Sequence, residues 1–125
     1  MTRYLAEPFM TTSLNRGKSV ECFLGGARRG DTRTIRWVSL RTDGDQIEAT
    51  LWEAEDVGNA EYLDIYSFPT VGEEPDEPIA RATFTELQDA IAHACKVWGA
   101  DPKRFVNEGL VQDEYADYLG SCRSG

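Results

Sequence analysis

The dipeptide Asp43-Gly44 constrains the fold of this chain more than any other short segment. It separates two segments of strand character, residues 34–42 and residues 46–52. Both of its residues tolerate a positive φ, which the tight turn of a two-residue β-hairpin requires. If this dipeptide forms the turn, Leu40 lies opposite Ile47. The sequence therefore predicts an antiparallel hairpin in this register.

Two further segments extend the hairpin into a meander. Residues 18–24 alternate around Val20 and form the first predicted strand, which ends at Gly25-Gly26. Residues 61–68 form a predicted fourth strand, after a turn signal over residues 56–59. Because the connections are too short for a crossover, the strands are antiparallel. The sequence predicts a β-meander of three or four strands over residues 18–68.

The last third of the chain has helical periodicity. Thr83 and Glu86 have the spacing of a capping box, and Gly99 stands where a left-handed C-cap is expected. A short helix is predicted to begin at Asp101-Pro102, and a last helix to cover about residues 111–119. The helix predicted between the capping box and Gly99 carries one apolar stripe, formed by Phe84, Leu87, Ile91, Ala94 and Trp98.

The other segments are not expected to form regular elements. Residues 1–17 are predicted to be an N-terminal arm, because Pro8 interrupts any helix there. Residues 69–82 are rich in proline and acidic side chains and are predicted to be a solvated loop. We expect residues 1–125 to form a single α+β domain, in which helices of residues 83–120 pack on one face of the meander.

Both faces of the predicted sheet are apolar. One is aliphatic and is the natural seat for the helices, whereas the other is aromatic and needs a second cover. That cover is the N-terminal arm, the bend of the sheet or a partner. The aliphatic face carries Val38, Leu40, Ile47, Ala49 and Leu51, joined by Leu63 and Ile65 if the second turn has three residues. The aromatic face carries Ile35, Trp37, Trp52, Tyr62, Tyr66 and Phe68.

Charge is divided unevenly along the chain. Residues 1–41 hold eight Lys or Arg and three acids, a balance of +5, whereas residues 42–125 hold five and nineteen, a balance of −14; together they give −9. An acidic surface steers cationic partners and repels the phosphates of nucleic acids. We therefore expect a basic protein as the partner and do not expect nucleic-acid binding.

Composition also bears on the compartment. The three cysteines (Cys22, Cys95 and Cys122) are widely spaced, which is typical of reduced thiols in a cytoplasmic protein. No apolar run approaches the roughly 18 residues of a membrane span, and the N-terminus has no hydrophobic secretory signal. The chain is thus predicted to be cytoplasmic and not membrane-bound.

Motifs for catalysis or cofactor binding fail on inspection. Residues 25–32 have the spacing of a phosphate-binding loop, but Asp31 stands where the lysine is required. Asp43 begins a segment like a calcium loop, in which apolar Ile47 occupies a later ligand position. His93 is the single histidine and has no partner at the spacing of a metal site or triad. We predict no catalytic residue, no metal and no cofactor, and favour a binding protein over an enzyme.

Two groups of side chains are candidates for partner contacts. The aromatic group either belongs to the core or forms an exposed patch with an acidic rim, and such patches mark binding sites. The arginine-bearing loop over residues 27–33 either grips an anion or acidic partner, or pairs with the acidic half of the protein itself. The first group comprises Trp37, Trp52, Tyr62 and Tyr66 with Glu48, Glu53, Glu61 and Asp64. The second comprises Arg28, Arg29 and Arg33.

These observations favour a small acidic protein-binding module. Its expected role is that of an inhibitor or immunity-type protein that occludes a basic partner such as a nuclease or toxin, by salt-sensitive association. One alternative is a structural or adaptor subunit that forms homodimers or larger homo-oligomers through its sheet. Another is a small-ligand-binding domain or enzyme with a pocket between sheet and helices.

Overall fold

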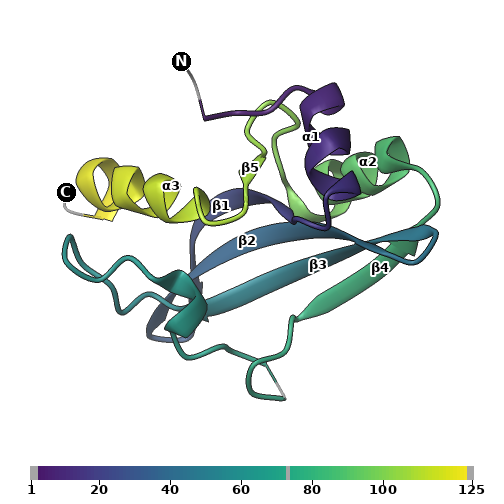
Figure 1. Cartoon of the computed structure of the whole chain (residues 1–125). Coiled ribbons are helices and arrows are strands. Elements are labelled where there is room, and N and C mark those ends of the chain that lie inside the picture. The colour runs from purple at the N-terminus through teal and green to yellow at the C-terminus, as the bar shows by residue number, and fades with distance from the viewer. Residues whose placement is uncertain (1–2, 73, 124–125) are drawn as a thin grey trace.

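The structure, a computed structural model, describes residues 3–72 and 74–123 (Figure 1). Within these residues, five antiparallel strands form one sheet in the order β4-β3-β2-β1-β5, together with three α-helices. The predicted α+β fold, a meander sheet with C-terminal helices, is confirmed. The elements are α1 (Glu7–Asn15), β1 (Val20–Arg29), β2 (Thr32–Asp43), β3 (Gln46–Glu55), a 3-10 turn (Ile65–Ser67), β4 (Ala80–Phe84), α2 (Leu87–Trp98), β5 (Val106–Asn107), α3 (Val111–Tyr118) and a π-helical turn (Leu119–Arg123).

The predicted hairpin forms one position further along the chain. Asp43 pairs with Gln46, so that Gly44 and Asp45 make the turn, and Leu40 lies opposite Ala49 instead of Ile47. Gly44 has a φ of +62°, a conformation that glycine adopts without steric cost. Moving the turn by one residue shifts the pairing by two, and the side chains of β2 and β3 therefore keep their predicted faces.

The first hairpin is longer than predicted. Strand β1 continues to Arg29 and β2 starts at Thr32, so the segment expected to be an arginine loop is mostly paired strand. The register between β1 and β2 shifts between Phe23 and Gly25, where a β-bulge bends the strand.

The predicted fourth strand over residues 61–68 is wrong. This segment is a loop with a short 3-10 turn, in which Ile65 and Phe68 bury their side chains without strand pairing. On the side of β3 away from β2, the neighbouring strand is β4. Its residues were predicted to be a loop and the first turn of a helix. Thr83 lies in β4 opposite Glu48, so the capping box does not form and α2 begins only at Leu87.

Two other local predictions are also wrong. Pro8 does not prevent a helix but lies in the first turn of α1, where its missing N–H is not needed. Asp101 does not start a helix; its side chain accepts a hydrogen bond from the Lys103 N–H (2.9 Å) in a turn that leads to β5. By contrast, Gly99 ends α2 with a φ of +82°, as predicted.

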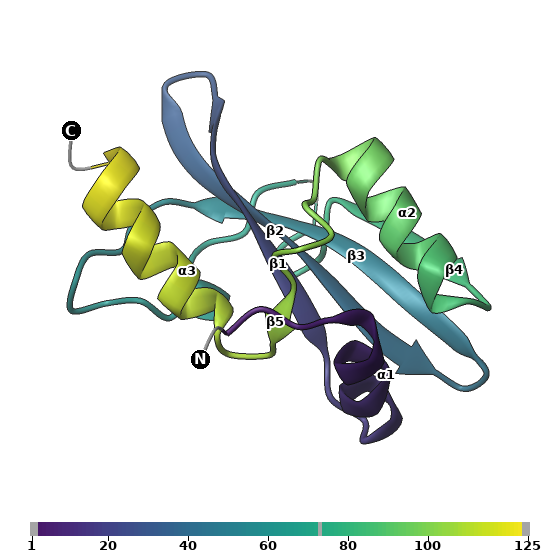
Figure 2. The ribbon, with the colours of Figure 1, turned by 90° about the horizontal axis from the view of Figure 1, so that it is seen from above.

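Helices cover both faces of the sheet. Helices α1 and α2 pack on the aliphatic face, whereas α3 and the loop over residues 56–68 pack on the aromatic face. Figure 2 shows α2 and α3 toward opposite ends of the sheet. Leu63 and Ile65, predicted on the aliphatic face, belong to the aromatic cluster. The buried aliphatic cluster comprises Met10, Leu14, Val20, Cys22, Val38, Leu40, Ala49, Leu51, Ala90, Ala94, Ala100 and Phe105. The buried aromatic cluster comprises Ile35, Trp37, Ala54, Ile65, Phe68, Val106, Val111 and Tyr115.

Candidate functional site

Three of the four predicted aromatic residues meet on the aromatic face of the sheet. Trp37 on β2 and Trp52 on β3 are directly opposite each other, with ring centroids 6.1 Å apart and planes inclined by 8°. Tyr66, on the 3-10 turn, meets Trp37 edge-on at 6.2 Å. Exposure rises across the group, because Trp37 is 3% exposed, Trp52 is half-buried and Tyr66 is 45% exposed. The cluster is therefore anchored in the core at one end and open at the other.

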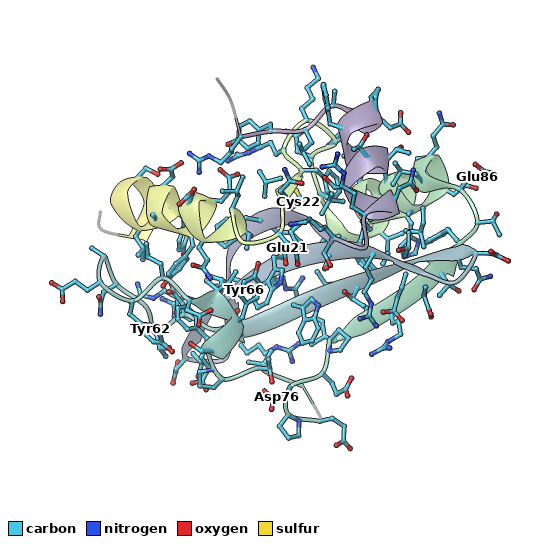
Figure 3. All side chains as sticks on the ribbon, in the orientation of Figure 1. Glu21, Cys22, Tyr62, Tyr66, Asp76 and Glu86 are labelled. Atoms are coloured by element: carbon cyan, nitrogen blue, oxygen red, sulfur yellow. The ribbon has the colours of Figure 1, made fainter. Side chains whose placement is uncertain are left out.

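A cavity of about 390 Å³ opens beside this cluster. This volume lies within the range of about 300–1,000 Å³ that is usual for ligand pockets. Figure 3 shows Glu21 at the sheet and Asp76 on the loop below it, with Tyr66 between them. The cavity is lined by Glu21, Trp37, Ser39, Trp52, Tyr66, Thr70 and Asp76. Among these described residues the charged ones are both acidic, so the cavity is suited to a cation.

Glu21 is the buried carboxylate of the cavity. It is 4% exposed, and its Oε1 accepts hydrogen bonds from the Tyr66 hydroxyl (2.5 Å) and the Gly109 N–H (3.2 Å). Among the described residues, its Oε2 accepts none. Burial raises the pKa of Glu21, although the hydrogen bonds from Tyr66 and Gly109 work in the other direction. Burial and the neighbouring Glu21 also raise the pKa of Tyr66, so the hydroxyl stays protonated and donates.

The loop between the 3-10 turn and β4 supplies the other side of the cavity. Asp76 adopts a φ of +61°, which Asp tolerates better than most residues do. Its N–H donates to the Thr70 hydroxyl at 2.7 Å. This bond closes the loop on itself and holds both Thr70 and Asp76 against the cavity.

The cavity continues along the same face of the sheet as a second hollow of about 430 Å³. Ser39 and Trp52 line both hollows. In the second hollow, Glu48 is ion-paired with Arg41 at 3.0 Å and with Arg81 at 3.2 Å. Glu77, the other acid there, is also ion-paired with Arg81, whereas Glu21 and Asp76 of the first cavity form no ion pair with the described residues.

The other predicted contact residues lie elsewhere. Tyr62 packs on Phe68, with centroids 5.0 Å apart, and does not line the cavity. Glu61 and Asp64 are exposed in the same loop as Tyr62. Glu53 lies on the other face of the sheet, because it alternates with Trp52 along β3.

Glu53 is the centre of a buried ion-pair network instead of a rim residue. Its carboxylate is 3.1 Å from Arg29 and 2.9 Å from Arg36, and accepts a hydrogen bond from the Thr34 hydroxyl at 2.7 Å. Burial alone would raise the pKa of Glu53, but the hydrogen bonds from these three residues hold it below its ordinary value.

Most of the predicted arginine loop pairs with acids of the same molecule. Arg29 pairs with Glu53, and Arg33 lies 3.9 Å from Asp56. Arg28 is exposed and forms no ion pair with the described residues. Five of the eight basic residues of positions 1–41 contact acids of positions 42–125, so the fold compensates much of the charge division. These pairs join Arg3 to Glu114 and Asp117, Arg29 and Arg36 to Glu53, Arg33 to Asp56, and Arg41 to Glu48.

Four of the seven cavity residues were not predicted from the sequence: Glu21, Ser39, Thr70 and Asp76. The alternation of β1 carried a signal for one of them, since Glu21 stands two positions before Phe23 and shares its face. No local pattern marked Asp76, because its position depends on how the 69–79 loop folds back onto the sheet.

Other sites that the sequence raised are structural. His93 packs against Phe84 and Trp98, at 5.3 and 4.8 Å between ring centroids. Cys22 is buried, and burial raises the pKa of its thiol to about 11, which makes it a poor nucleophile. In residues 3–72 and 74–123, no three His, Cys, Asp or Glu side chains are grouped to hold a metal ion. The helices in this part of the chain are also too short or too polar to cross a membrane.

Comparison of the chain with protein-family models, curated proteins and solved structures finds no match. We therefore infer function from the geometry and charge of the cavity alone.

Proposed function

We propose that this protein is a recognition module that binds a basic protein partner through the open part of the aromatic face of its sheet. The observation that carries this proposal is the stacked Trp37–Trp52 pair, which borders an open cavity instead of being sealed in the core. The charged groups in that cavity, Glu21 and Asp76, are both carboxylates. Aromatic rings and carboxylates together attract cationic side chains.

The extent of the face favours a protein over an isolated small ion. Two hollows adjoin along β2 and β3, sharing Ser39 and Trp52, and give an elongated surface. Half-exposed aromatic residues such as Trp52 and Tyr66 are typical anchors of protein interfaces. The net charge of −9 would speed the encounter with a basic partner and make it sensitive to salt.

A finer form of the proposal concerns the role of binding. A partner whose basic surface performs its activity, such as a nuclease or toxin, would be inhibited when this acidic face covers that surface. Charge complementarity supports this inhibitor or immunity-type role, which rests on the same contact surface.

Capture from an extract of the native host tests the proposal. The immobilised protein is compared with Trp52→Ala, and with Phe9→Ala as a matched control, because Phe9 is an aromatic residue on α1 that is 64% exposed. We expect the wild type and Phe9→Ala to retain the same basic protein, a salt step to release it, and Trp52→Ala to retain much less. Retention of only acidic proteins, or equal retention by Trp52→Ala, would contradict the proposal.

Self-association is the second candidate, and one observation favours it. Strand β4 lies at the edge of the sheet and, among the described residues, pairs only with β3, so its other edge is open to another chain. Sizing at low and high salt separates the two functions. A monomer at both salt concentrations agrees with the proposed function, whereas a salt-insensitive dimer would support a structural subunit.

A further inference from the structure

One carboxylate oxygen of the cavity, Oε2 of Glu21, accepts no hydrogen bond from the described residues. Glu21 uses Oε1 for both of its hydrogen bonds. Its Oε2 is not one of the described side-chain atoms that are fully buried without a hydrogen-bond partner. Because the residue lines the cavity, Oε2 is available to a ligand that enters it. The hydroxyls of Ser39 and Thr70 and the carboxylate of Asp76 lie on the same lining.

The aromatic part of the cavity is flat and its orientation is fixed. The Trp52 indole N–H donates to the Thr50 hydroxyl at 3.0 Å, which sets the rotation of the ring. Trp37 stacks on Trp52, and Tyr66 holds an edge against Trp37. A half-buried, oriented indole in a cavity that a carboxylate also lines is suited to a planar cation.

A guanidinium group fits this combination better than an ammonium group. Guanidinium is planar, stacks on aromatic rings, is weakly hydrated and presents several N–H donors in a fixed fork. An ammonium is compact and strongly hydrated, and gains less from a flat aromatic wall.

We propose that this cavity receives the guanidinium group of an arginine side chain, stacked on Trp52 and donating hydrogen bonds to Oε2 of Glu21. This inference rests on the proposed function, because the arginine belongs to the basic protein partner. Glu21, buried beside the cavity, is the counter-ion, and Tyr66 positions it through the hydrogen bond to Oε1.

The test measures binding of three probes to the purified protein. They are N-acetyl-arginine methylamide, N-acetyl-lysine methylamide and tetramethylammonium. The readout is the NMR shift of the Gly109 backbone N–H, which contacts Glu21 directly. We expect the arginine probe to bind at least about tenfold more tightly than the other two. Equal affinities for the arginine and lysine probes would overturn the inference.

Two substitutions that each remove one acidic side chain give a matched comparison. Glu21→Gln and Glu61→Gln remove the same charge, but Glu61 is exposed and does not line the cavity. We expect Glu21→Gln to weaken arginine binding by at least about tenfold and Glu61→Gln by less than about twofold. Equal losses would show that only general charge attraction operates. If Glu21→Gln fails to fold, Trp52→Leu tests the stacking half of the site, and unchanged affinity would overturn it.

The outcome separates this inference from the proposed function. If a basic protein is captured through Trp52 but the arginine probe shows no preference and Glu21→Gln has no effect, the guanidinium site is wrong and the recognition function remains. If tetramethylammonium binds most tightly, the cavity instead takes a small quaternary ammonium ligand. If no basic protein is captured, both proposals fail.

Discussion

Trp37 and Trp52 stack face to face across β2 and β3, with their planes inclined by 8°, yet only Trp37 is fully buried. The shared stack joins the core of the protein to its open cavity. Trp37 thus supports the site from within, and Trp52 presents the surface that a partner reaches.

This division of roles predicts different effects of truncation. Trp37→Ala should lower the free energy of unfolding by about 3–5 kcal/mol, because it leaves a large cavity in the core. Trp52→Ala should lower it by only about 1–2 kcal/mol, because part of its ring is already exposed to water. Urea denaturation of both variants checks the difference. Equal losses would mean that Trp52 is a core residue and not a binding surface.

Glu21 should destabilise the free protein at neutral pH. Its raised pKa in the fold means that the folded state favours the protonated form; its contribution is most favourable below about pH 4.3, the ordinary pKa of Glu. That contribution is lost as pH rises through the raised value. The titratable groups that act on it are Tyr66 and Glu108, and Asp76 lines the same cavity.

We therefore expect Glu21→Gln to raise the free energy of unfolding at pH 7 by on the order of 1 kcal/mol. The gain should shrink below about pH 4, where the wild-type carboxyl is protonated as well. Denaturant titrations at several pH values measure this, with the exposed Glu61→Gln as the control. Destabilisation by Glu21→Gln at pH 7 would indicate that the carboxylate is structural and not reserved for a ligand.

Glu53 should show the opposite pH dependence. Its pKa is lowered in the fold, so its full contribution to stability is present above about pH 4.3 and is lost as pH falls through the lowered value. Glu53→Gln should reduce stability at pH 7 by about 1–3 kcal/mol, since Arg29 and Arg36 lose the negative charge of their buried partner but stay partly exposed.

The pH profile of Glu53→Gln is the check. Its free energy of unfolding should fall less between pH 5 and pH 3 than that of the wild type. Parallel profiles for the two proteins would exclude Glu53 as a source of acid sensitivity.

Gly58 should not tolerate a side chain. A Cβ at this position would lie 2.5 Å from the Tyr62 carbonyl oxygen and 2.7 Å from the Tyr115 ring. Gly58→Ala should therefore cost about 1–3 kcal/mol through overpacking. Gly120→Ala is the matched control, because a Cβ there would meet no atom within 4 Å, and should change stability by less than about 0.5 kcal/mol. Thermal unfolding of both variants tests this, and similar melting temperatures would contradict the packing of the 56–68 loop on α3.

The parts of the fold that sequence predicted correctly depend on local patterns. The turn near Gly44, the alternation along β2 and β3, and the end of α2 at Gly99 each follow from residues close in sequence. The alternation also separated Trp37 and Trp52 from the aliphatic face, which is why these two of the seven cavity residues were predicted on a shared face.

The wrong predictions share a physical cause, namely packing between distant segments. Tyr62 to Phe68 alternate like a strand, but Phe68 packs on Tyr115 of α3 and the segment forms a loop. Strand β4 has little strand character and forms because the edge of β3 is free to pair. The position of Asp76 beside Trp52 depends on the same long-range folding, so no local signal revealed it.

The most direct test of the central claim is an NMR titration of the tryptophan indole N–H signals with a nonapeptide of alternating arginine and glycine. Trp52 and Trp37 border the cavity, whereas Trp98 packs with His93 on the other face and is an internal control. We predict a saturable shift of the Trp52 indole, a smaller one for Trp37 and none for Trp98. No shift of Trp52, or equal shifts of all three indoles, would contradict the claim that this aromatic cavity binds basic partners.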